Sequence, residues 1–562
     1  MTERLRLAVV QANPTVGDIA GNLALAKTFV LDEKDADLVV FPECFLSGYP
    51  LEDLVRRSGF RAQLRDAIAE FTRFVRDTNG PAVLMGTPVD GLDLPYNAAL
   101  MFHPDGTLRA AHKRDLPNTD VFDEVRTFTP GAHSRTMPLD GFRLGVGICE
   151  EMWHPMVAGE LAGDLASILI FINGSPFEDG KQRLRHQLAR RRVQETGLPL
   201  IYVNLVGGQD EVVFDGASFA MNRHGQLVAQ MPAFKDGVMR LELTRNSNDT
   251  FDIEPEAAHS AGTPYPERLD ALYTGAMVAL RDYITKNGFE GVVLGMSGGI
   301  DSALVAAIAT DAIGPGRVHC RMMPSGYTST TSVEDAAECA GLLGAEHRSI
   351  SIAPAIAAYG QMLAEEFDGL AEDVTEENLQ ARARAMTLLA LSNKFNWMVL
   401  ATGNKSEMSV GYATLYGDMV GGYAILKDIY KTDVFALARW RNEHRPVCAL
   451  GPRGPVIPER IITKPPTAEL KEGQTDEQAL GGYDLLDATL RALIEKELDP
   501  RAAALAASRE TGKDVEPAYA QKIAALVKRA EWKRRQAPPG PKLTSRPFGK
   551  GWRYPITNKA GL

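Results

Sequence analysis

Short apolar runs alternate along the first half of the chain with segments whose apolar residues recur at helical spacing. Runs rich in Val, Ile and Leu and stopped by Gly, Pro or Asn have the pattern of buried strands; they are LRLAVVQA, DLVVFPE, AVLMGTP, FRLGVGICE, SILIFING and LPLIYVNLVG. Helical spacing is found in NLALAKTFVLDEK and QRLRHQLARRRVQETG. This alternation predicts a layered α/β domain.

A polar, proline-containing stretch then interrupts the alternation. The residues TRNSNDTFDIEPEAAHSAGTPYPER, 244–268, have the composition of a linker. We therefore expect a first domain over residues 1–245, a linker over 246–268, and a second domain with a C-terminal tail over 269–562.

The second half has a different pattern. ERLDALYTGAMVALRDYITKNG predicts an amphipathic helix, GVVLGMSGG a buried strand that enters a glycine-rich turn, and NKFNWMVLATGN another strand that ends in small polar residues. Strand, glycine-rich turn and helix in succession predict a doubly wound parallel sheet of Rossmann-like type. In such a sheet the ligand binds at the carboxyl ends of the strands.

Composition and charge exclude several classes of protein. Of the 562 residues, 45% are hydrophobic and 24% are charged, as in ordinary globular proteins. The net charge of −11 disfavours a dedicated nucleic-acid binder. No apolar run approaches the roughly 18 residues of a membrane span, and the first apolar run is too short for a secretory signal. We expect neither nucleic acid nor a membrane as partner.

Cysteine spacing adds a statement about the compartment. The five cysteines are isolated and form no C-x-x-C pair: Cys44, Cys149, Cys320, Cys339 and Cys448. This spacing predicts neither a disulfide framework nor a zinc cluster, and it indicates a reducing cytoplasm.

The segment LGMSGGIDSALVAAIA, 294–309, carries the clearest local chemistry. A Ser-Gly-Gly loop that opens a helix aims several backbone N–H groups at one point, where the helix dipole adds positive potential. The loop therefore predicts an anion site of the kind that binds phosphate. Walker spacing is missing, which disfavours a kinase or an ordinary NTPase. Taken alone, the loop could also be a structural turn.

Longer motifs favour the phosphate interpretation. SGGIDS resembles the pyrophosphatase loop of ATP-dependent adenylating synthetases, which cleave ATP between the α- and β-phosphates. ATGNKSEMSVGYATLYGDMVGGYAILKDIYKTDVFALA, 401–438, resembles the signature of the NAD⁺ synthetases. MPSGYTST, ENLQARAR, KPPTAEL and KRRQAPPGPK resemble further segments of that family in the same order, so the resemblance covers most of the chain after Gly291.

This resemblance implies roles for individual residues. The pyrophosphate of ATP is held by Ser297, Gly298, Gly299 and Ser302, and other parts of ATP are contacted by Thr402, Arg382, Lys431 and Thr467. Asp301 and Glu407 coordinate Mg²⁺, a hard cation that suits carboxylates. Asp418 and Lys533 hold the dinucleotide substrate.

The implied reaction has two steps. Mg·ATP adenylates the nicotinate carboxylate of deamido-NAD⁺ with release of pyrophosphate, and ammonia then displaces AMP to give NAD⁺. Ammonia must attack as NH₃, although most of it is NH₄⁺ in neutral water. We therefore expect a sheltered source of ammonia.

The first domain contains three positions that suggest such a source, two of them at the ends of predicted strands. Glu43 ends DLVVFPE, Lys113 lies in HKRDLPNTDVFDE, and Cys149 ends FRLGVGIC. Alone, the cysteine could be an inert core residue, and Glu43 and Lys113 a structural ion pair. Together they resemble the Glu-Lys-Cys triad of the nitrilase superfamily, which implies an α-β-β-α sandwich. We expect the side chain of Cys44 on the opposite side of Glu43's strand.

The resemblance assigns chemistry to the triad. Cys149 attacks a carbonyl as a thiolate, Lys113 favours the thiolate and the oxyanion, and Glu43 accepts and returns the proton. Fusion to an ammonia-consuming domain selects glutamine as the substrate, held by Glu124, Thr119, Ser175 and Lys181. The family often has Tyr where this chain has Thr119, which bears on one wall of the glutamine pocket.

As a whole, the chain resembles the glutamine-dependent NAD⁺ synthetases, and this family resemblance implies a homo-oligomer, either a dimer through the second domains or a larger assembly. One alternative is another glutamine-dependent adenylating amidotransferase of the ATP pyrophosphatase family, but such an enzyme should lack GNKSE joined to YGDM and LKDIYKT. A non-enzymatic dinucleotide sensor is the other alternative. The sensor is disfavoured because the triad and both proposed metal carboxylates are present.

Overall fold

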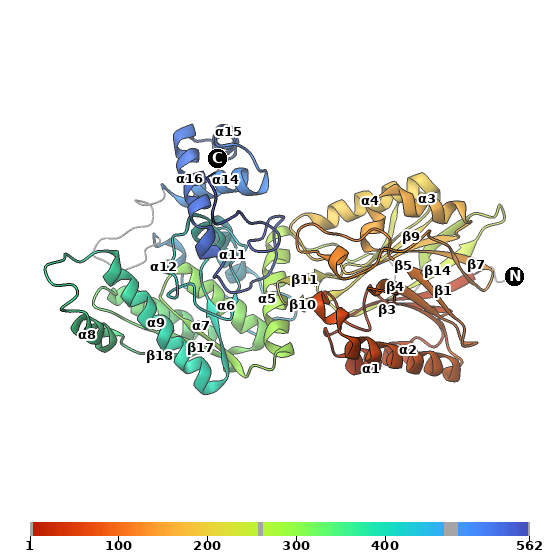
Figure 1. Ribbon diagram of the computed structural model, residues 1–562, viewed down its shortest axis with the longest axis horizontal. Helices are drawn as coiled ribbons and strands as arrows, with labels where there is room; N and C mark the ends of the chain where they lie inside the picture. The colour runs from red at the N-terminus through yellow and green to blue at the C-terminus, as the bar shows by residue number, and fades with distance from the viewer. Residues whose placement is uncertain (1–3, 257–261, 466–480, 560–562) are drawn as a thin grey trace. The chain divides into compact units, whose positions relative to one another are not determined.

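The computed structural model describes residues 4–256, 262–465 and 481–559. The chain divides into two compact units, Met1–Glu267 and Arg268–Leu562, which are described one at a time (Figure 1).

The described part of the first unit contains two large sheets. One has the strand order β15 (Phe251–Pro255), β14 (Gly237–Arg245), β1 (Arg4–Gln11), β2 (Leu38–Val40), β3 (Ala82–Val89), β4 (Tyr96–Phe102), β5 (Leu108–His112). The other has the order β13 (Leu227–Gln230), β12 (Phe219–Met221), β9 (Leu200–Asn204), β8 (Ile168–Asn173), β7 (Phe142–Ile148), β6 (Met137–Leu139). A hairpin of β10 (Val206–Gln209) and β11 (Val212–Asp215) stands beside them.

Alternating apolar residues place the two sheets face to face. One buried cluster joins Leu7 and Leu84 of the first sheet to Val146 and Ile170 of the second. The outer face of the first sheet packs against α1 (Ile19–Asp32) and α2 (Ser58–Thr78), and that of the second packs against α3 (Pro155–Gly163) and α4 (Lys181–Thr196) (Figure 1). The expected α-β-β-α sandwich is confirmed.

Strand β15 lies inside the range 246–268 that the sequence predicts as a linker. It pairs antiparallel with β14 and extends the edge of the first sheet. As an edge strand, it buries only Ile253 of its five residues. The sequence therefore shows too few apolar residues here to predict a strand.

The second unit is built on a parallel sheet with the order β18 (Glu346–Ser349), β17 (Val318–Met322), β16 (Gly291–Gly295), β19 (Trp397–Ala401), β20 (Tyr423–Ala424). The order reverses between β16 and β19, which confirms the doubly wound sheet. Ligands bind at such a switch point, outside the carboxyl ends of the strands.

Helices connect the strands of this sheet, and the last helices of the unit pack against other helices. They are α5 (Arg268–Lys286), α6 (Ile300–Ile313), α7 (Thr330–Leu343), α8 (Ala353–Met362), α9 (Val374–Phe395), α10 (Lys405–Val410), α11 (Lys431–Glu443) and α12 (Glu459–Thr463), followed by α14 (Tyr483–Leu490), α15 (Pro500–Thr511), α16 (Pro517–Arg529) and α17 (Glu531–Arg534). Helix α6 is apolar on nearly all sides and correspondingly almost entirely buried.

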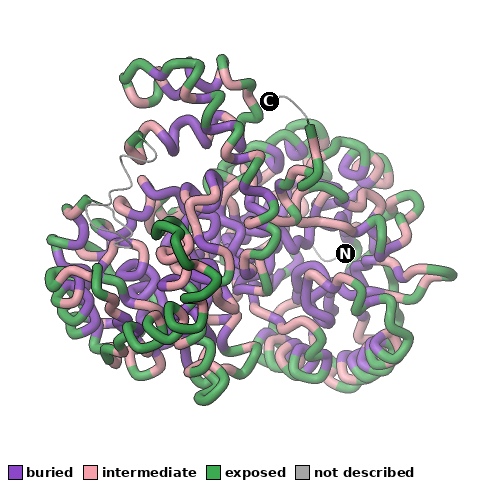
Figure 2. The backbone as a smooth tube through the Cα atoms, turned by 60° about the vertical axis from the view of Figure 1, so that its left-hand side comes forward, coloured by how far each residue is buried: buried purple, intermediate pink, exposed green. Residues whose placement is uncertain are grey.

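Burial follows these layers. In Figure 2, buried positions run along the strands and the inner sides of helices, and exposed positions occupy loops and outer helical turns. Among the described residues, no helix combines the length and the apolar character that crossing a membrane requires.

Candidate active sites

Three strand ends of the first unit position the expected triad. Glu43 follows β2, Lys113 directly follows β5, and Cys149 directly follows β7. Cys149 has a φ of +51°, a strained value for a residue with a side chain, and it opens the short helical turn Cys149–Met152.

Lys113 joins two carboxylates in the interior of this unit. Its Nζ donates to Glu43 Oε1 at 2.7 Å and forms an ion pair with Glu124 Oε2 at 2.9 Å. The backbone N–H of Gly174 donates to Glu43 Oε2 at 2.6 Å. Because Glu43, Lys113 and Glu124 are all buried, the cluster must balance its charges with protein groups alone.

The charges of the cluster and its burial shift the pKa of the Cys149 thiol. Burial raises the pKa of the Cys149 thiol well above its usual value, Glu43 adds to the effect, and Lys113 opposes it. Burial opposes the charge of Lys113, but the carboxylates of Glu124 and Glu43 outweigh it and raise the pKa of the ammonium. The resting cysteine is therefore a thiol beside a permanent cation and a carboxylate that can take its proton.

The residues expected to hold glutamine occupy different surroundings. Ser175 follows Gly174; its backbone N–H donates to Asn204 Oδ1 at 2.9 Å, and Arg185 donates to its carbonyl at 2.9 Å and its hydroxyl at 3.1 Å. Burial raises the pKa of Glu150, the residue after Cys149, and Lys113 opposes this increase. Lys181, which begins α4, opposes it more weakly. Thr119 is exposed and accepts the backbone N–H of Phe122 in the turn that leads to Glu124.

Two buried residues that the sequence did not single out also contact the carboxylates. Asn97 Nδ2 donates to Glu43 Oε1 at 2.7 Å and to Glu124 Oε1 at 3.3 Å, and the Tyr49 hydroxyl donates to Glu124 Oε1 at 2.9 Å. A signal for Asn97 did exist, because it is a polar residue within the apolar strand YNAALMF.

The structure corrects the expected position of Cys44. Strand β2 ends at Val40, so strand alternation does not apply to Cys44, whose φ is +48°. Its Sγ donates to Asn97 Oδ1 at 3.5 Å. The Cys44 thiol is therefore linked to the Glu43 carboxylate through the side chain of Asn97. It does not lie on the opposite side of a strand.

In the second unit, the Ser-Gly-Gly loop lies between β16 and α6. Gly298 has a φ of +78°, and a Cβ there would lie 2.3 Å from the Ser332 carbonyl oxygen, so this position requires glycine. The Ser302 hydroxyl accepts the backbone N–H of Ser297 at 3.2 Å and donates to the Gly299 carbonyl at 3.0 Å. This bonding fixes the loop at the start of the helix.

Two cavities adjoin the loop. The larger, of about 250 Å³, and the smaller, of about 110 Å³, share Ser297, Thr402 and Asp418 among their lining residues. Asp301, Ser302 and Glu407 also line the smaller one. The expected loop, metal and substrate residues are thus brought to one region at the carboxyl ends of β16 and β19.

Lys431 joins the two carboxylates expected to bind Mg²⁺. Its Nζ donates to Asp301 Oδ2 at 2.5 Å and to Glu407 Oε1 at 3.1 Å. Asn404, which caps α10, donates to Asp301 Oδ1 at 2.8 Å and was missed within the GNKSE motif. Although the described residues hold no group of three or more His, Cys, Asp or Glu suited to a metal, two carboxylates beside a phosphate loop match the way proteins hold Mg²⁺.

The other predicted residues of this site have varied positions. Asp418 accepts the backbone N–H of Thr414 at 2.8 Å, and Lys533 donates to the carbonyls of Gly411 at 2.9 Å and Ala413 at 2.7 Å. Arg382 is exposed and donates to the Leu415 carbonyl at 3.3 Å. Thr467 lies outside the described residues.

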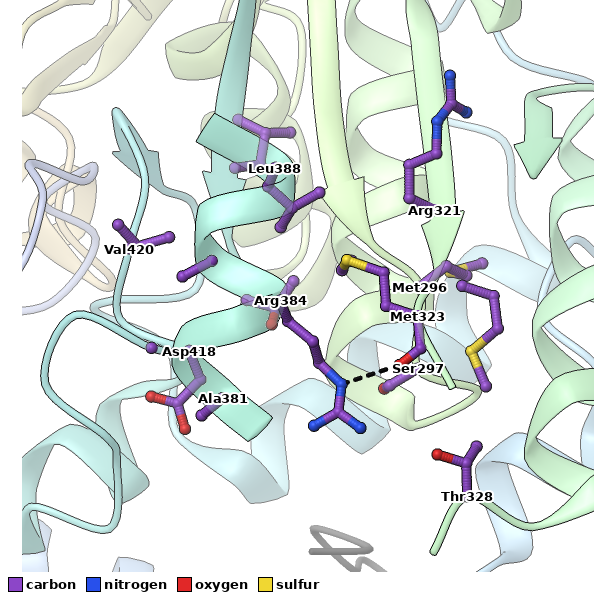
Figure 3. A pocket seen from close by; sticks show the side chains of 16 residues that line it. Met296, Ser297, Arg321, Met323, Thr328, Ala381, Arg384, Leu388, Asp418 and Val420 are labelled. Atoms are coloured by element: carbon purple, nitrogen blue, oxygen red, sulfur yellow. Dashed lines mark hydrogen bonds between the residues drawn. The ribbon is translucent and has the colours of Figure 1, made fainter. Parts of the chain in front are cut away.

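Arg384 lines the larger cavity where the sequence pointed to Arg382. Figure 3 shows it extending from α9 toward Met323, whose carbonyl accepts its Nε–H at 3.0 Å. Arg382 and Arg384 both belong to ENLQARAR, and a helix turns about 200° over two residues, so the two side chains face different sides.

Comparison with known proteins covers the whole chain. The carbon-nitrogen hydrolase family matches residues 6–250, and the NAD synthase family matches residues 272–537. A glutamine-dependent NAD⁺ synthetase of Rhodobacter capsulatus is 46% identical over 565 residues, covering 100% of this chain and 99% of the relative. One from Thermotoga maritima is 40% identical over 587 residues, covering 99% of each.

Solved structures agree with these matches. The structure of the glutamine-dependent NAD⁺ synthetase from Acinetobacter baumannii in complex with ADP has a TM-score of 0.76 and 39% identity, and covers 98% of both chains. The enzyme of the same name from Cytophaga hutchinsonii has a TM-score of 0.79 at 20% identity, covering 99% of this chain and 98% of that one, and supports the fold alone.

Proposed function

Because this chain belongs to the family of glutamine-dependent NAD⁺ synthetases, we propose that its two units divide one reaction between two active sites. The protein is a ligase that forms a C–N bond with glutamine as the amide donor. We assign the release of ammonia to Cys149 and its neighbours, and the adenylation and amidation of deamido-NAD⁺ to the surroundings of Ser297. The buried Lys113 between Glu43 and Glu124 carries the assignment of the first site.

Glutamine hydrolysis follows from the charges of this cluster. Glu43 takes the proton of the Cys149 thiol, and the thiolate attacks the carboxamide carbon of glutamine. Lys113 and the backbone N–H of Glu150 stabilise the oxyanion. Protonated Glu43 gives its proton to the departing nitrogen, which leaves as NH₃ and a glutamyl thioester. Water, activated by Glu43, then cleaves the thioester to glutamate and restores the thiol. Glu124, Thr119, Ser175 and Lys181 hold the substrate.

In the second site, this chain's groups bind and orient ATP and the dinucleotide. The backbone N–H groups of the glycine loop bind the departing pyrophosphate, and Lys431 donates to phosphate oxygens. Asp301 and Glu407 would hold Mg²⁺, which when bound neutralises charge developing on phosphate oxygens. The other proposed contacts are Gly298, Gly299, Ser302, Thr402 and Thr467 for ATP, with Arg384 on the cavity wall in place of the exposed Arg382, and Asp418 and Lys533 for deamido-NAD⁺.

Domain limits, assembly and compartment complete the proposal. We assign the glutaminase domain to residues 1–245 together with strand β15 of the predicted linker 246–268, which belongs to the first sheet, and the synthetase domain to residues 269–562. The two family matches, 6–250 and 272–537, support a boundary between these domains. We propose a homo-oligomer, at least a dimer through the second units, which sedimentation would test. All five cysteines are free thiols, which supports a reducing cytoplasm.

The test is Cys149→Ala with both nitrogen sources. We expect glutamine-supported NAD⁺ formation to fall by about three orders of magnitude or more, since no thioester can form. Ammonium at mildly alkaline pH should still support synthesis at a substantial rate. Equal loss with glutamine and ammonium in a folded variant would contradict the division of labour.

A further inference from the structure

Asn97 lies in β4 with no exposed surface. A side-chain amide offers two N–H donors at one end and a carbonyl acceptor at the other, and each needs a partner when water is excluded. The partners of this amide are all groups of the candidate glutaminase site or its immediate neighbours.

The donor end is shared between two carboxylates. Nδ2 donates to Glu43 Oε1 at 2.7 Å and to Glu124 Oε1 at 3.3 Å. Ionised carboxylates only accept hydrogen bonds, so the amide cannot be turned over without placing its oxygen against them. Each carboxylate thereby receives one of the two amide hydrogens.

The acceptor end faces Cys44. The Sγ of Cys44 donates to Asn97 Oδ1 at 3.5 Å, and burial, reinforced by the charges of Glu43 and Glu124, raises the pKa of this thiol well above its usual value. Cys44 therefore stays protonated and remains a donor. The backbone carbonyl of Asn97 also accepts the N–H of Lys113 at 2.8 Å, which fixes the strand end that carries the catalytic lysine.

We propose that Asn97 is a positioning residue for glutamine hydrolysis, which holds Glu43 and Glu124 where Lys113 reaches both, and that Cys44 fixes the direction of its amide. This inference rests on the proposed role of Glu43 as the base. Within the described structure, Oε1 of Glu43 already accepts from Lys113 and Asn97, whereas Oε2 accepts from Gly174. Asn97 thus leaves Oε2 as the oxygen that takes the proton of Cys149.

Two pairs of variants separate positioning from packing. Asn97→Leu removes both donors while keeping the branched shape of the side chain, and Asn97→Asp replaces the donor end with a third carboxyl group. Cys44→Ala removes the donor to the amide, and Cys44→Ser restores one as a matched control. Glutamine hydrolysis is measured as kcat and KM from pH 5 to 9, and ammonium-supported synthesis and thermal unfolding are measured in parallel.

We expect Asn97→Leu to lower kcat about a hundredfold, because two hydrogen bonds to ionised groups are lost, with KM for glutamine within about threefold of the parent. The acidic limb of the rate profile should move to higher pH in both Asn97 variants, because the carboxylates lose a donor that favours their ionised forms. The titratable groups facing Glu43 are Lys113, Glu124, Cys149, Cys44 and Tyr49. Synthesis with ammonium should stay unchanged.

The two Cys44 variants test the positioning role if the Asn97 variants fail to fold. Cys44→Ala should lower kcat about fivefold and move the same limb in the same direction, and Cys44→Ser should stay within about twofold of the parent. A parent-like profile in Cys44→Ala, or in folded Asn97→Leu, overturns the positioning role. If Cys149→Ala still uses glutamine, the proposed function itself fails, and the two failures are thereby distinguished.

Discussion

Both units place one buried lysine between two carboxylates, but the carboxylates differ in what surrounds them. In the first unit the side chains of Lys113, Glu43 and Glu124 are 0%, 0% and 4% exposed. In the second, Lys431 is 2% exposed, but Asp301 and Glu407 are 19% and 17% exposed and line a cavity of about 110 Å³.

This difference matches the chemistry proposed for each site. Thioester formation needs only protein groups and glutamine, and transfer of the Cys149 proton to Glu43 leaves the net charge of the buried cluster unchanged. Adenylation brings the charge of ATP and Mg²⁺ into the site, so the carboxylates must be accessible. A lysine between two carboxylates therefore serves a closed site in the first unit and an open site in the second. The two sites differ in how exposed their carboxylates are.

The largest effect is expected for Lys113→Met. Without the cation, two buried carboxylates face each other, which we expect to lower the free energy of unfolding of the first unit by about 3 to 5 kcal/mol. Glutamine-supported synthesis should fall at least about a thousandfold, because the thiolate and the oxyanion lose their counter-charge. Rates with both nitrogen sources and urea unfolding measure this. A stable variant that uses glutamine normally would show that Lys113 is not the counter-charge of the closed site.

Lys431→Met should have a smaller effect on stability and a broader effect on activity. Water in the cavity can solvate Asp301 and Glu407, so we expect a loss of about 1 to 2 kcal/mol in the free energy of unfolding. Synthesis should fall about a hundredfold with glutamine and with ammonium alike, because both routes use the same adenylation. If its destabilisation equalled that of Lys113→Met, the distinction between closed and open clusters would be lost.

Arg384→Ala tests the larger cavity of the open site. Removing a guanidinium from its wall should raise KM for ATP about tenfold, since a charge-assisted contact to a phosphate or base is lost. Arg348, whose side chain is 72% exposed, supplies the control Arg348→Ala, for which no change is expected. Initial rates at varied ATP measure both variants, and an unchanged KM in Arg384→Ala would exclude the residue from the ATP site.

The sequence predicted the fold and the charged centres because both depend on local patterns. Glu43, Cys149 and the glycine loop follow apolar strands, so their place at strand ends could be read from the sequence. Asn97 and Asn404 could not be found this way, because their importance depends on which strand or helix faces which carboxylate. Cys44 was misplaced because strand β2 is shorter than the apolar run that contains it.

The smallest expected difference concerns a buried carboxyl group beside each cluster. Burial raises the pKa of Glu151 from 4.5 to about 7, although hydrogen bonds from the backbone N–H groups of Arg114 and Ile148 lower it. Burial likewise raises the pKa of Asp487 from 3.8 to about 6, although hydrogen bonds from groups that include Ser406 lower it. Each folded carboxyl group binds its proton more tightly than the unfolded one, so each contributes stability at low pH. That stability is lost as pH rises, from 4.5 to about 7 for Glu151 and from 3.8 to about 6 for Asp487.

Between about pH 6 and 7, therefore, only Glu151 of this pair still contributes a slope, at most about 1.4 kcal/mol per pH unit. Glu151→Gln should flatten the pH dependence of the first unit in this window, whereas Asp487→Asn should flatten that of the second unit only at lower pH. Urea unfolding followed by hydrogen exchange of peptides from each unit measures both slopes. The slope decides the outcome even if Glu151→Gln loses overall stability, because an amide cannot titrate. An unchanged slope in Glu151→Gln would show that this carboxyl group is already ionised in the folded first unit, and that the interior around Cys149 is more accessible to water than the comparison requires.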